Sequence, residues 1–222
     1  MRSFKKYIAV LLCLLTVALS LASCRGGNAE DTDTAETGSD VIVIGENSFY
    51  STIALDEYVS LCQYKGLTFD ISGTDGSRED MEAAVSKHIY EKSEIKKYPE
   101  APIAYYFEQE KSFYMYLAKG DAEQYAALLA EEGVSEQDLK ARAEKYVAED
   151  LVFYAITEAE SISVSETEKA ELFDKYAKEY VDTYGYTEEY VRENLSDLIY
   201  DSMLFDKTME FLIANNTFVS DD

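Results

Sequence analysis

The sequence LKARAEKYVAEDLVFYAITEAESISVSETE, residues 139–168, decides the fold of this chain. Its apolar residues recur four, seven, eight, twelve, fifteen and sixteen positions after the first leucine, and charged residues occupy the opposite side. This spacing is that of one helical stripe, so it predicts an amphipathic helix of roughly 25 residues, about 38 Å long. The stripe consists of Leu139, Ala143, Tyr146, Val147, Leu151, Tyr154 and Ala155.

The helical pattern breaks at residues 161–165, and a second helix is expected to begin there. Ser165 and Glu168 have the spacing of a capping box, in which each side chain satisfies a backbone N–H of the first turn. Pro99 and Pro102 are expected to stop an earlier helix, since proline disfavours helix in the residue before it. The fold class expected is mainly α, an extended multi-helix domain with at most a minor two-stranded β element. The other expected elements are strands at 41–44 and 67–71 and helices at 77–97, 103–118, 121–132, 165–184 and 187–214.

The N-terminus has the pattern of an export signal. Three basic residues precede an apolar stretch at 7–21, which is short for a stable membrane span. Leu21-Ala22-Ser23-Cys24 follows and resembles the bacterial lipobox, in which cleavage precedes the cysteine and its sulfur receives a lipid. We therefore expect a lipoprotein signal peptide at 1–23 and a lipid on Cys24, which would anchor the protein to the extracytoplasmic face of a cell membrane. The alternative is an ordinary secretory signal with an incidental cysteine.

After the signal, the sequence divides by composition into three parts. Residues 24–40 contain no large apolar residue and are predicted to be a disordered tether. Residues 41–97 are predicted to be a small strand-plus-helix segment, and residues 98–216 a helical domain.

The charge of the chain excludes one class of partner. The formal net charge is −24, and loss of the three basic residues of the signal lowers it to −27. Such a surface repels phosphates, so nucleic acid is not an expected partner.

The chain offers few residues for catalysis or metal binding. Once Cys13 leaves with the signal and Cys24 is lipidated, only Cys62 remains, so neither a disulfide nor a cysteine metal cluster is expected. The single histidine, His88, lies on the apolar side of a predicted helix and is expected to pack in the core. Acidic pairs such as Glu158 and Glu160 are typical of solvated faces at this acid content. No glycine-rich phosphate loop or dinucleotide fingerprint occurs, so no enzyme, cofactor or metal site is expected.

Aromatic residues are the remaining candidates for binding. The chain has 19 Tyr and 10 Phe but no Trp, and tyrosine combines a broad apolar face with a polar end. These rings either pack the helical core or present an apolar surface to a partner. Tyr105, Tyr106 and Phe107 are consecutive, so they cannot all point inward along a helix, which favours some exposed surface. The candidates for client binding are Tyr105, Tyr106, Phe107, Phe113, Tyr114, Tyr116 and Tyr125.

Three segments resemble the trigger factor family of ribosome-associated chaperones, and more loosely the helical chaperone domains of SurA-type and PrsA-type export foldases. The first is Tyr64-Lys65-Gly66-Leu67, similar to the strand that leads into the family's prolyl isomerase domain. The second is the set of Pro99, Pro102, Gly120, Tyr125 and Gly133, similar to the opening of the C-terminal domain. The third is residues 156–168, ITEAESISVSETE, similar to its helix-break-helix signature.

The resemblance implies a chaperone without an isomerase. Only about 25 residues separate the first segment from Pro99, whereas an FKBP-like isomerase needs a whole sheet and an aromatic pocket. The resemblance therefore implies a membrane-anchored holdase that binds unfolded or exported polypeptides in a cradle of helical arms. The alternative is a scaffold or adhesion lipoprotein that binds one folded envelope partner.

Overall fold

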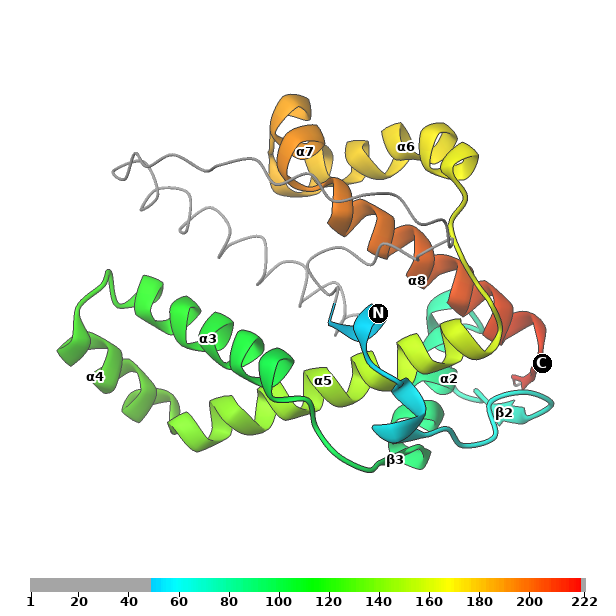
Figure 1. Cartoon of the computed structure of the whole chain (residues 1–222), viewed down its shortest axis with the longest axis horizontal. Helices are drawn as coiled ribbons and strands as arrows, with labels where there is room; N and C mark the ends of the chain where they lie inside the picture. The colour runs from blue at the N-terminus through cyan, green and yellow to red at the C-terminus, as the bar shows by residue number, and fades with distance from the viewer. Residues whose placement is uncertain (1–48, 221–222) are drawn as a thin grey trace. The chain divides into compact units, whose positions relative to one another are not determined.

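A computed structural model describes residues 49–220 of this chain (Figure 1). The expected signal peptide, Cys24, the tether and the candidate strand at 41–44 lie outside the described residues. Between residues 49 and 220 no helix is both long and apolar enough to cross a membrane.

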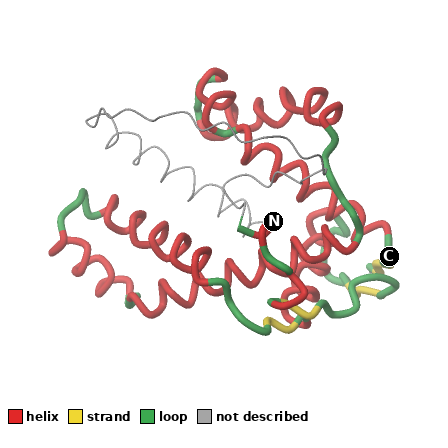
Figure 2. The backbone as a smooth tube through the Cα atoms, viewed as in Figure 1, coloured by secondary structure: helices red, strands yellow, loops and turns green. Residues whose placement is uncertain are grey.

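Helices make up most of the described chain, which confirms the mainly α class (Figure 2). Two short 3₁₀ helices, η1 (Tyr50–Thr52) and η2 (Leu55–Glu57), come first. The α-helices are α2 (Arg78–Lys92), α3 (Glu100–Leu117), α4 (Ala122–Glu132), α5 (Glu136–Ala159), α6 (Glu166–Tyr184), α7 (Glu188–Asn194) and α8 (Ser196–Ala214).

The β structure consists of two small pairings. β1 (Val59–Ser60) is antiparallel to β3 (Glu94–Ile95). β2 (Thr68–Asp70) is the strand expected at 67–71, and it pairs in parallel with β4 (Thr217–Val219). The Phe69 and Phe218 rings stack across this pair with centroids 5.5 Å apart. The β4 pairing ties the end of α8 to the segment before α2.

Three boundaries differ from the sequence prediction. The helix expected at 77–97 ends at Lys92, well before Pro99, and Glu94–Ile95 form strand β3 instead. Pro102 does not stop a preceding helix: it lies in the first turn of α3, where its missing N–H would have no helical partner anyway. The last helix is not continuous. Leu195, at φ −121° and ψ 10°, separates α7 from α8, and its side chain is buried.

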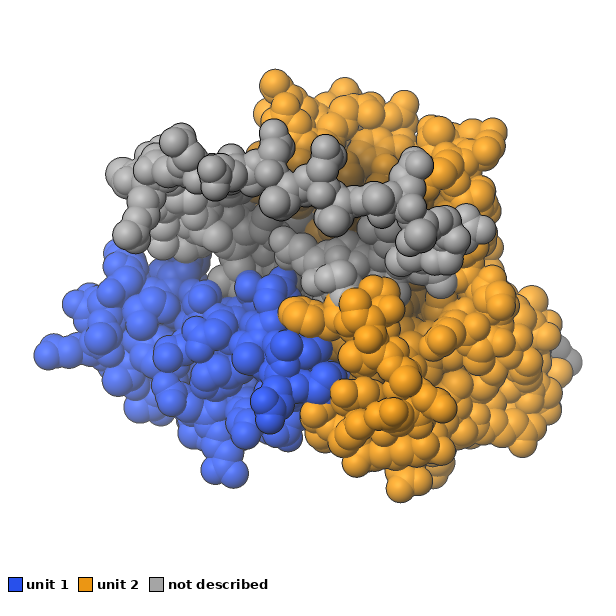
Figure 3. All heavy atoms as spheres, viewed as in Figure 1, with its two compact units in different colours: residues 1–41, 99–147 blue, residues 42–98, 148–222 orange. Residues whose placement is uncertain are grey.

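The chain forms two compact units, coloured blue and orange in Figure 3. Unit 1 includes residues 99–147, and unit 2 includes residues 42–98 and 148–222. The boundary between residues 147 and 148 falls within α5, so the two units share this helix. The units group segments that are distant in sequence, and the division into segments 41–97 and 98–216 stays a prediction about sequence order.

Unit 1 contains α3, α4 and the first half of α5. Asp121 caps α4 by accepting hydrogen bonds from two backbone N–H groups, and Gly133 ends it in the left-handed region at φ 65°. The core of the unit consists of Tyr114, Ala118, Tyr125, Leu129 and Leu139.

Unit 2 surrounds the second half of α5. Residues 151–157, LVFYAIT, are all buried, so this part of the helix packs on every side and is not amphipathic. The Phe153 ring lies 5.7 Å from that of Phe205 on α8, and the Thr157 and Thr208 hydroxyls are 3.3 Å apart. Tyr50 stacks on Tyr154 at 4.9 Å. The predicted single stripe of buried residues therefore describes only the part of α5 before Leu151.

The start of α6 is held by the predicted capping box. The Glu168 backbone N–H donates to the Ser165 hydroxyl at 3.3 Å, and the Glu168 carboxylate accepts the Ser165 N–H at 2.8 Å. The other carboxylate oxygen accepts from Lys207 Nζ on α8 at 2.7 Å. These contacts, the one from Lys207 first, lower the pKa of Glu168 from 4.5 to about 2.

We predict a pH-dependent loss of stability in Glu168→Gln. Because the folded pKa lies below the unfolded one, the ionised carboxylate stabilises the fold above about pH 4.5, and this contribution is lost as the pH falls toward 2. The variant should therefore be less stable than the natural chain at pH 7, and the difference should shrink at pH 3. Urea unfolding at both pH values measures it, with the exposed Glu171→Gln on the same helix as the control. An equal deficit at both pH values would contradict the assignment.

Candidate functional site

The seven aromatic candidates all lie in unit 1, where six are on α3 and one is on α4. The structure places them in three groups. Tyr114 and Tyr125 are buried, with 4% and 8% of their surface exposed, whereas Tyr116 is 54% exposed. The four half-buried candidates are Tyr105, Tyr106, Phe107 and Phe113.

Tyr114 is a packing residue, held by polar contacts at its hydroxyl. This hydroxyl donates to Glu132 Oε2 at 3.0 Å and accepts from Arg142 Nη1 at 3.2 Å. Arg142 Nη1 also donates to Glu110 Oε2 at 3.2 Å, and the Tyr146 hydroxyl donates to Glu110 Oε1 at 2.8 Å. Glu110 is buried, so these donors replace the water that its carboxylate has lost. The network connects α3 to both α4 and α5 and fixes the backbone on which the other rings sit.

The accessible apolar surface of unit 1 is carried by Tyr116 and the neighbouring Leu117, which is 45% exposed. Other half-buried apolar side chains of unit 1 pack against its core: Phe107, Phe113, Met115, Leu128 and Val134. We call this set, with Tyr116 and Leu117, the arm surface. Its apolar groups rest on a fixed core and do not need to be ordered when a partner binds.

A second row of rings, which the sequence did not single out, lies in unit 2 at the turn between α6 and α7. The centroid distances are 5.8 Å from Tyr180 to Tyr184, 6.3 Å from Tyr184 to Tyr186 and 5.0 Å from Tyr186 to Tyr190. Tyr180 is buried and its hydroxyl lies 3.0 Å from that of Ser202. The signal in the sequence was four tyrosines within eleven residues around Gly185, a turn that brings both helix ends together.

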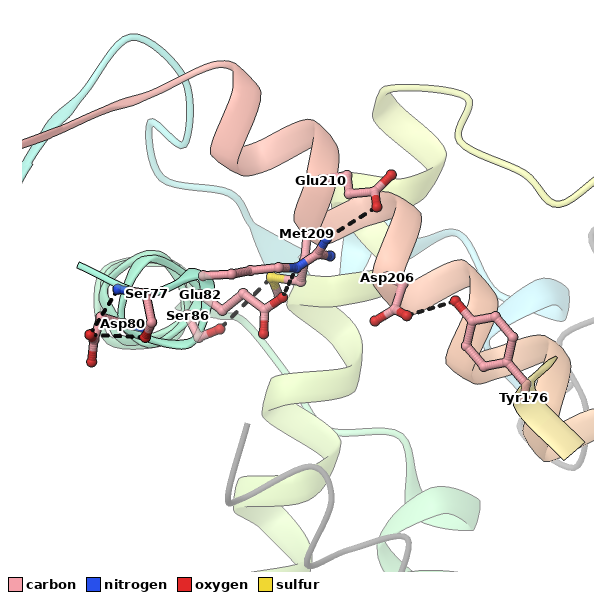
Figure 4. Close-up of polar contacts among 9 residues, drawn as sticks. Ser77, Asp80, Glu82, Ser86, Tyr176, Asp206, Met209 and Glu210 are labelled. Carbon is pink, nitrogen blue, oxygen red and sulfur yellow. Dashed lines mark hydrogen bonds and ion pairs between the residues drawn. The ribbon is translucent and has the colours of Figure 1, made fainter. Parts of the chain in front are cut away.

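Polar side chains lie between α2 and α8, and catalysis by a serine there would need a base beside it (Figure 4). Glu82 is 2% exposed, and its Oε1 accepts from Arg78 Nε at 2.7 Å, while Arg78 Nη1 reaches Glu210 on α8 at 3.1 Å. Ser86 contacts the Met209 sulfur at 4.0 Å. These contacts connect two helices and supply no base to the serine.

The His88 imidazole contacts a backbone carbonyl and an aromatic ring. Its Nε2 lies 3.0 Å from the Gln63 carbonyl oxygen, and the Phe69 ring meets the imidazole edge-on at 5.6 Å. Hence His88 and Ser86 do not form a nucleophile–base pair. Within residues 49–220 no group of three potential metal ligands comes together.

The comparisons with known proteins identify one family. The model of the bacterial trigger factor protein C-terminus matches residues 74–214, which is more than half of the chain. The match begins before α2 and ends with α8, so it includes helices of both units. No curated protein and no solved structure gives a significant match.

We predict that truncation separates packing rings from surface rings in unit 1. Tyr114→Ala should lower the free energy of unfolding by about 3–5 kcal/mol, because it leaves a cavity and removes the hydrogen bonds of the hydroxyl with Glu132 and Arg142. Tyr116→Ala should change it by no more than about 0.5 kcal/mol, because that ring is mostly solvated. Urea unfolding of both variants measures the difference. Similar losses would show that Tyr116 also belongs to the core.

Proposed function

We infer the function from family membership: this chain belongs to the family of the bacterial trigger factor C-terminus, a chaperone-type domain that binds polypeptides. We propose that it acts as a holdase for unfolded or exported polypeptides on the extracytoplasmic face of a membrane. In this proposal it is anchored by a lipid on Cys24 and has no prolyl isomerase activity.

The observation that carries the proposal is the arm surface. Tyr116 and Leu117 are adjacent, large and exposed, and they extend from a core that holds further half-buried rings. Such a patch is typical of a protein interaction site, and tyrosine accepts varied partners because its ring is apolar and its hydroxyl tolerates water.

The expected binding is weak and needs no energy source. At about 25 cal/mol per Å², burial of ~300 Å² of apolar surface yields about 7 kcal/mol. The loss of translational and rotational freedom offsets much of this gain. A client would therefore bind and leave repeatedly, and the net charge of −27 that remains after loss of the three basic signal residues would keep the complex soluble.

The absence of an isomerase is supported by the interval between β2 and α3. Residues 71–99 contain only α2 and the two-residue strand β3. An isomerase needs a sheet around an aromatic pocket, and this interval does not provide one. The proposed activity is holding alone.

We predict that the chain suppresses aggregation and that the arm surface contributes to this activity. The natural chain should slow aggregation of a chemically unfolded client at near-stoichiometric ratio without ATP, as measured by light scattering. The double variant Tyr116→Ser/Leu117→Ser should require two- to fivefold more protein for the same effect, because it removes the most exposed apolar groups of unit 1.

A matched control uses the same residue types in unit 2. Tyr98 and Leu172 are 43% and 37% exposed, so Tyr98→Ser/Leu172→Ser removes a similar apolar area elsewhere. It should retain most of the suppression. Absence of suppression by the natural chain across several clients would overturn the proposal, and equal losses in both double variants would remove the special role of the arm surface.

The anchor proposal predicts a lipid label that depends on one cysteine. In a bacterial host, Cys24→Ser should abolish incorporation of radiolabelled palmitate into the protein, because the thiol that receives the lipid is gone. Cys62→Ser keeps the lipobox and should be labelled like the natural chain. Labelling of Cys24→Ser, or its loss in Cys62→Ser, would contradict the assignment.

A further inference from the structure

A pocket of about 340 Å³ lies in unit 2, on helices α6, α7 and α8. It is separate in sequence from the arm surface, and no function above uses it. Its size is at the lower end of ligand pockets, so it suits one or two side chains more than a long segment. The lining residues that matter here are Lys169, Phe173, Asp174, Arg192, Ser196 and Tyr200, which we call the cation–aromatic pocket.

The pocket places a cation on the face of each of two aromatic rings. The Arg192 guanidinium carbon lies 5.2 Å from the Phe173 ring centroid, and Lys169 Nζ lies 4.9 Å from the Tyr200 centroid. The two rings are neighbours, with centroids 6.0 Å apart and planes at 60°. Cation–π contacts hold the charged groups beside the rings. One small site thus combines apolar surface with positive charge.

Both cations already have acidic partners, but these partners are solvated. Arg192 Nη2 lies 2.6 Å from Asp174 Oδ1, and the Asp174 side chain is 77% exposed. Lys169 Nζ lies 2.6 Å from Glu166 Oε1, and the Glu166 side chain is 88% exposed. Exposed ion pairs of this kind contribute little to stability. An incoming carboxylate can therefore replace either partner at little cost.

The charge near the pocket differs from that of the rest of the surface. The chain has 44 acidic and 20 basic residues, so most of its surface repels an acidic ligand. Lys169 and Arg192 are balanced by Glu166 and Asp174, so these four groups carry no net charge and repel an acidic ligand less than the rest of the surface does. The Ser196 hydroxyl donates to the Arg192 carbonyl oxygen at 2.6 Å, so only its oxygen remains to accept a hydrogen bond.

We propose that the cation–aromatic pocket binds a polypeptide segment in which a carboxylate lies beside an aromatic or large apolar side chain. The client side chain packs against Phe173 and Tyr200, and its carboxylate pairs with the Arg192 guanidinium, with Lys169 adding positive charge. The carboxylate is either the C-terminus of the segment or an Asp or Glu side chain within it. This inference rests on the proposed holding function and gives unit 2 a charge-dependent contact of its own.

The first test uses small probes that separate the two chemistries. N-acetylphenylalanine carries both the ring and the carboxylate, its amide lacks the charge, and N-acetylglycine lacks the ring. NMR titration of the chain should show shifts at residues 169–174 and 192–200 with N-acetylphenylalanine at millimolar concentration. The other two probes should bind at least fivefold more weakly. Equal binding of acid and amide overturns the proposal.

Peptides then distinguish the two sources of the carboxylate. A peptide ending in Phe with a free carboxylate is compared with its amidated form, and an amidated peptide with internal Phe-Glu is compared with one containing Phe-Gln. A preference confined to the first pair assigns the site to chain termini, and a preference in the second pair assigns it to acidic side chains. Lack of preference in both pairs counts against the proposal.

Variants test the residues with a control on the same helix. Arg192→Gln and Lys169→Gln should each weaken N-acetylphenylalanine binding about fivefold or more. Lys178→Gln removes a comparable exposed ion pair of α6, that with Asp182 at 2.7 Å, outside the pocket, and should leave binding unchanged. Equal effects of Arg192→Gln and Lys178→Gln would show only a general response to charge and would overturn the site.

Failure of the pocket proposal can be distinguished from failure of the holding function. If carboxylate-dependent binding is absent, the pocket proposal fails even where the chain suppresses aggregation. If the binding is present but no client is protected, the pocket's ligand chemistry stands and the holding function fails.

Discussion

The structure depends on the burial of helix α5, which supplies core residues to both compact units. In unit 1 its buried positions follow one stripe, Leu139, Ala143 and Val147, each with 0% of its surface exposed. In unit 2 the seven consecutive residues 151–157 are buried on every side. A helix buried all round is a core element, whereas a helix with one buried stripe leaves its other side in water. The same helix thus meets two packing environments, and the change falls at Leu151, directly after Glu149 and Asp150.

The size of unit 1 accounts for its accessible rings. The described part of unit 1, residues 99–147, has only about 50 residues and buries a smaller share of its surface than a large domain does, because surface area falls more slowly than volume as a domain becomes smaller. Three helices shield the cluster around Tyr114 and Leu139 but leave Phe107 and Phe113 half-buried and Tyr116 exposed. The contacts of Glu110 and Arg142 add polar connections between the helices where apolar burial is limited. The exposed apolar groups follow from the architecture, and solvated acidic residues keep them in solution.

Local signals predicted the elements well, and long-range contacts were not predictable from them. Ser77, Ser165 and Gly133 mark helix ends because capping depends on residues within one turn. The parallel pairing of β2 with β4 joins strands almost 150 residues apart, and three-residue strands carry too little periodicity to reveal it. On α3 aromatic residues occur on every side, so only the positions of α4 and α5 decide that Tyr114 is buried and Tyr116 is not. The cation–aromatic pocket was missed for the same reason, since its residues come from three helices and the Arg192–Asp174 ion pair joins two of them.

The proposed contacts are each weak, and this weakness suits a protein that holds other chains. The arm surface would act through apolar burial, which salt does not screen, and the cation–aromatic pocket through ion pairing, which salt weakens. A client that occupies one site raises the effective concentration of its remaining segments at the other, as far as the client chain between them can reach. Holding then requires no strong single contact, and release requires only that two weak contacts open in turn. An extended client benefits most, because a folded protein has buried the apolar side chains that both sites bind. Under this proposal, selectivity for unfolded chains would arise from the client's own exposure of apolar side chains, without a recognition sequence.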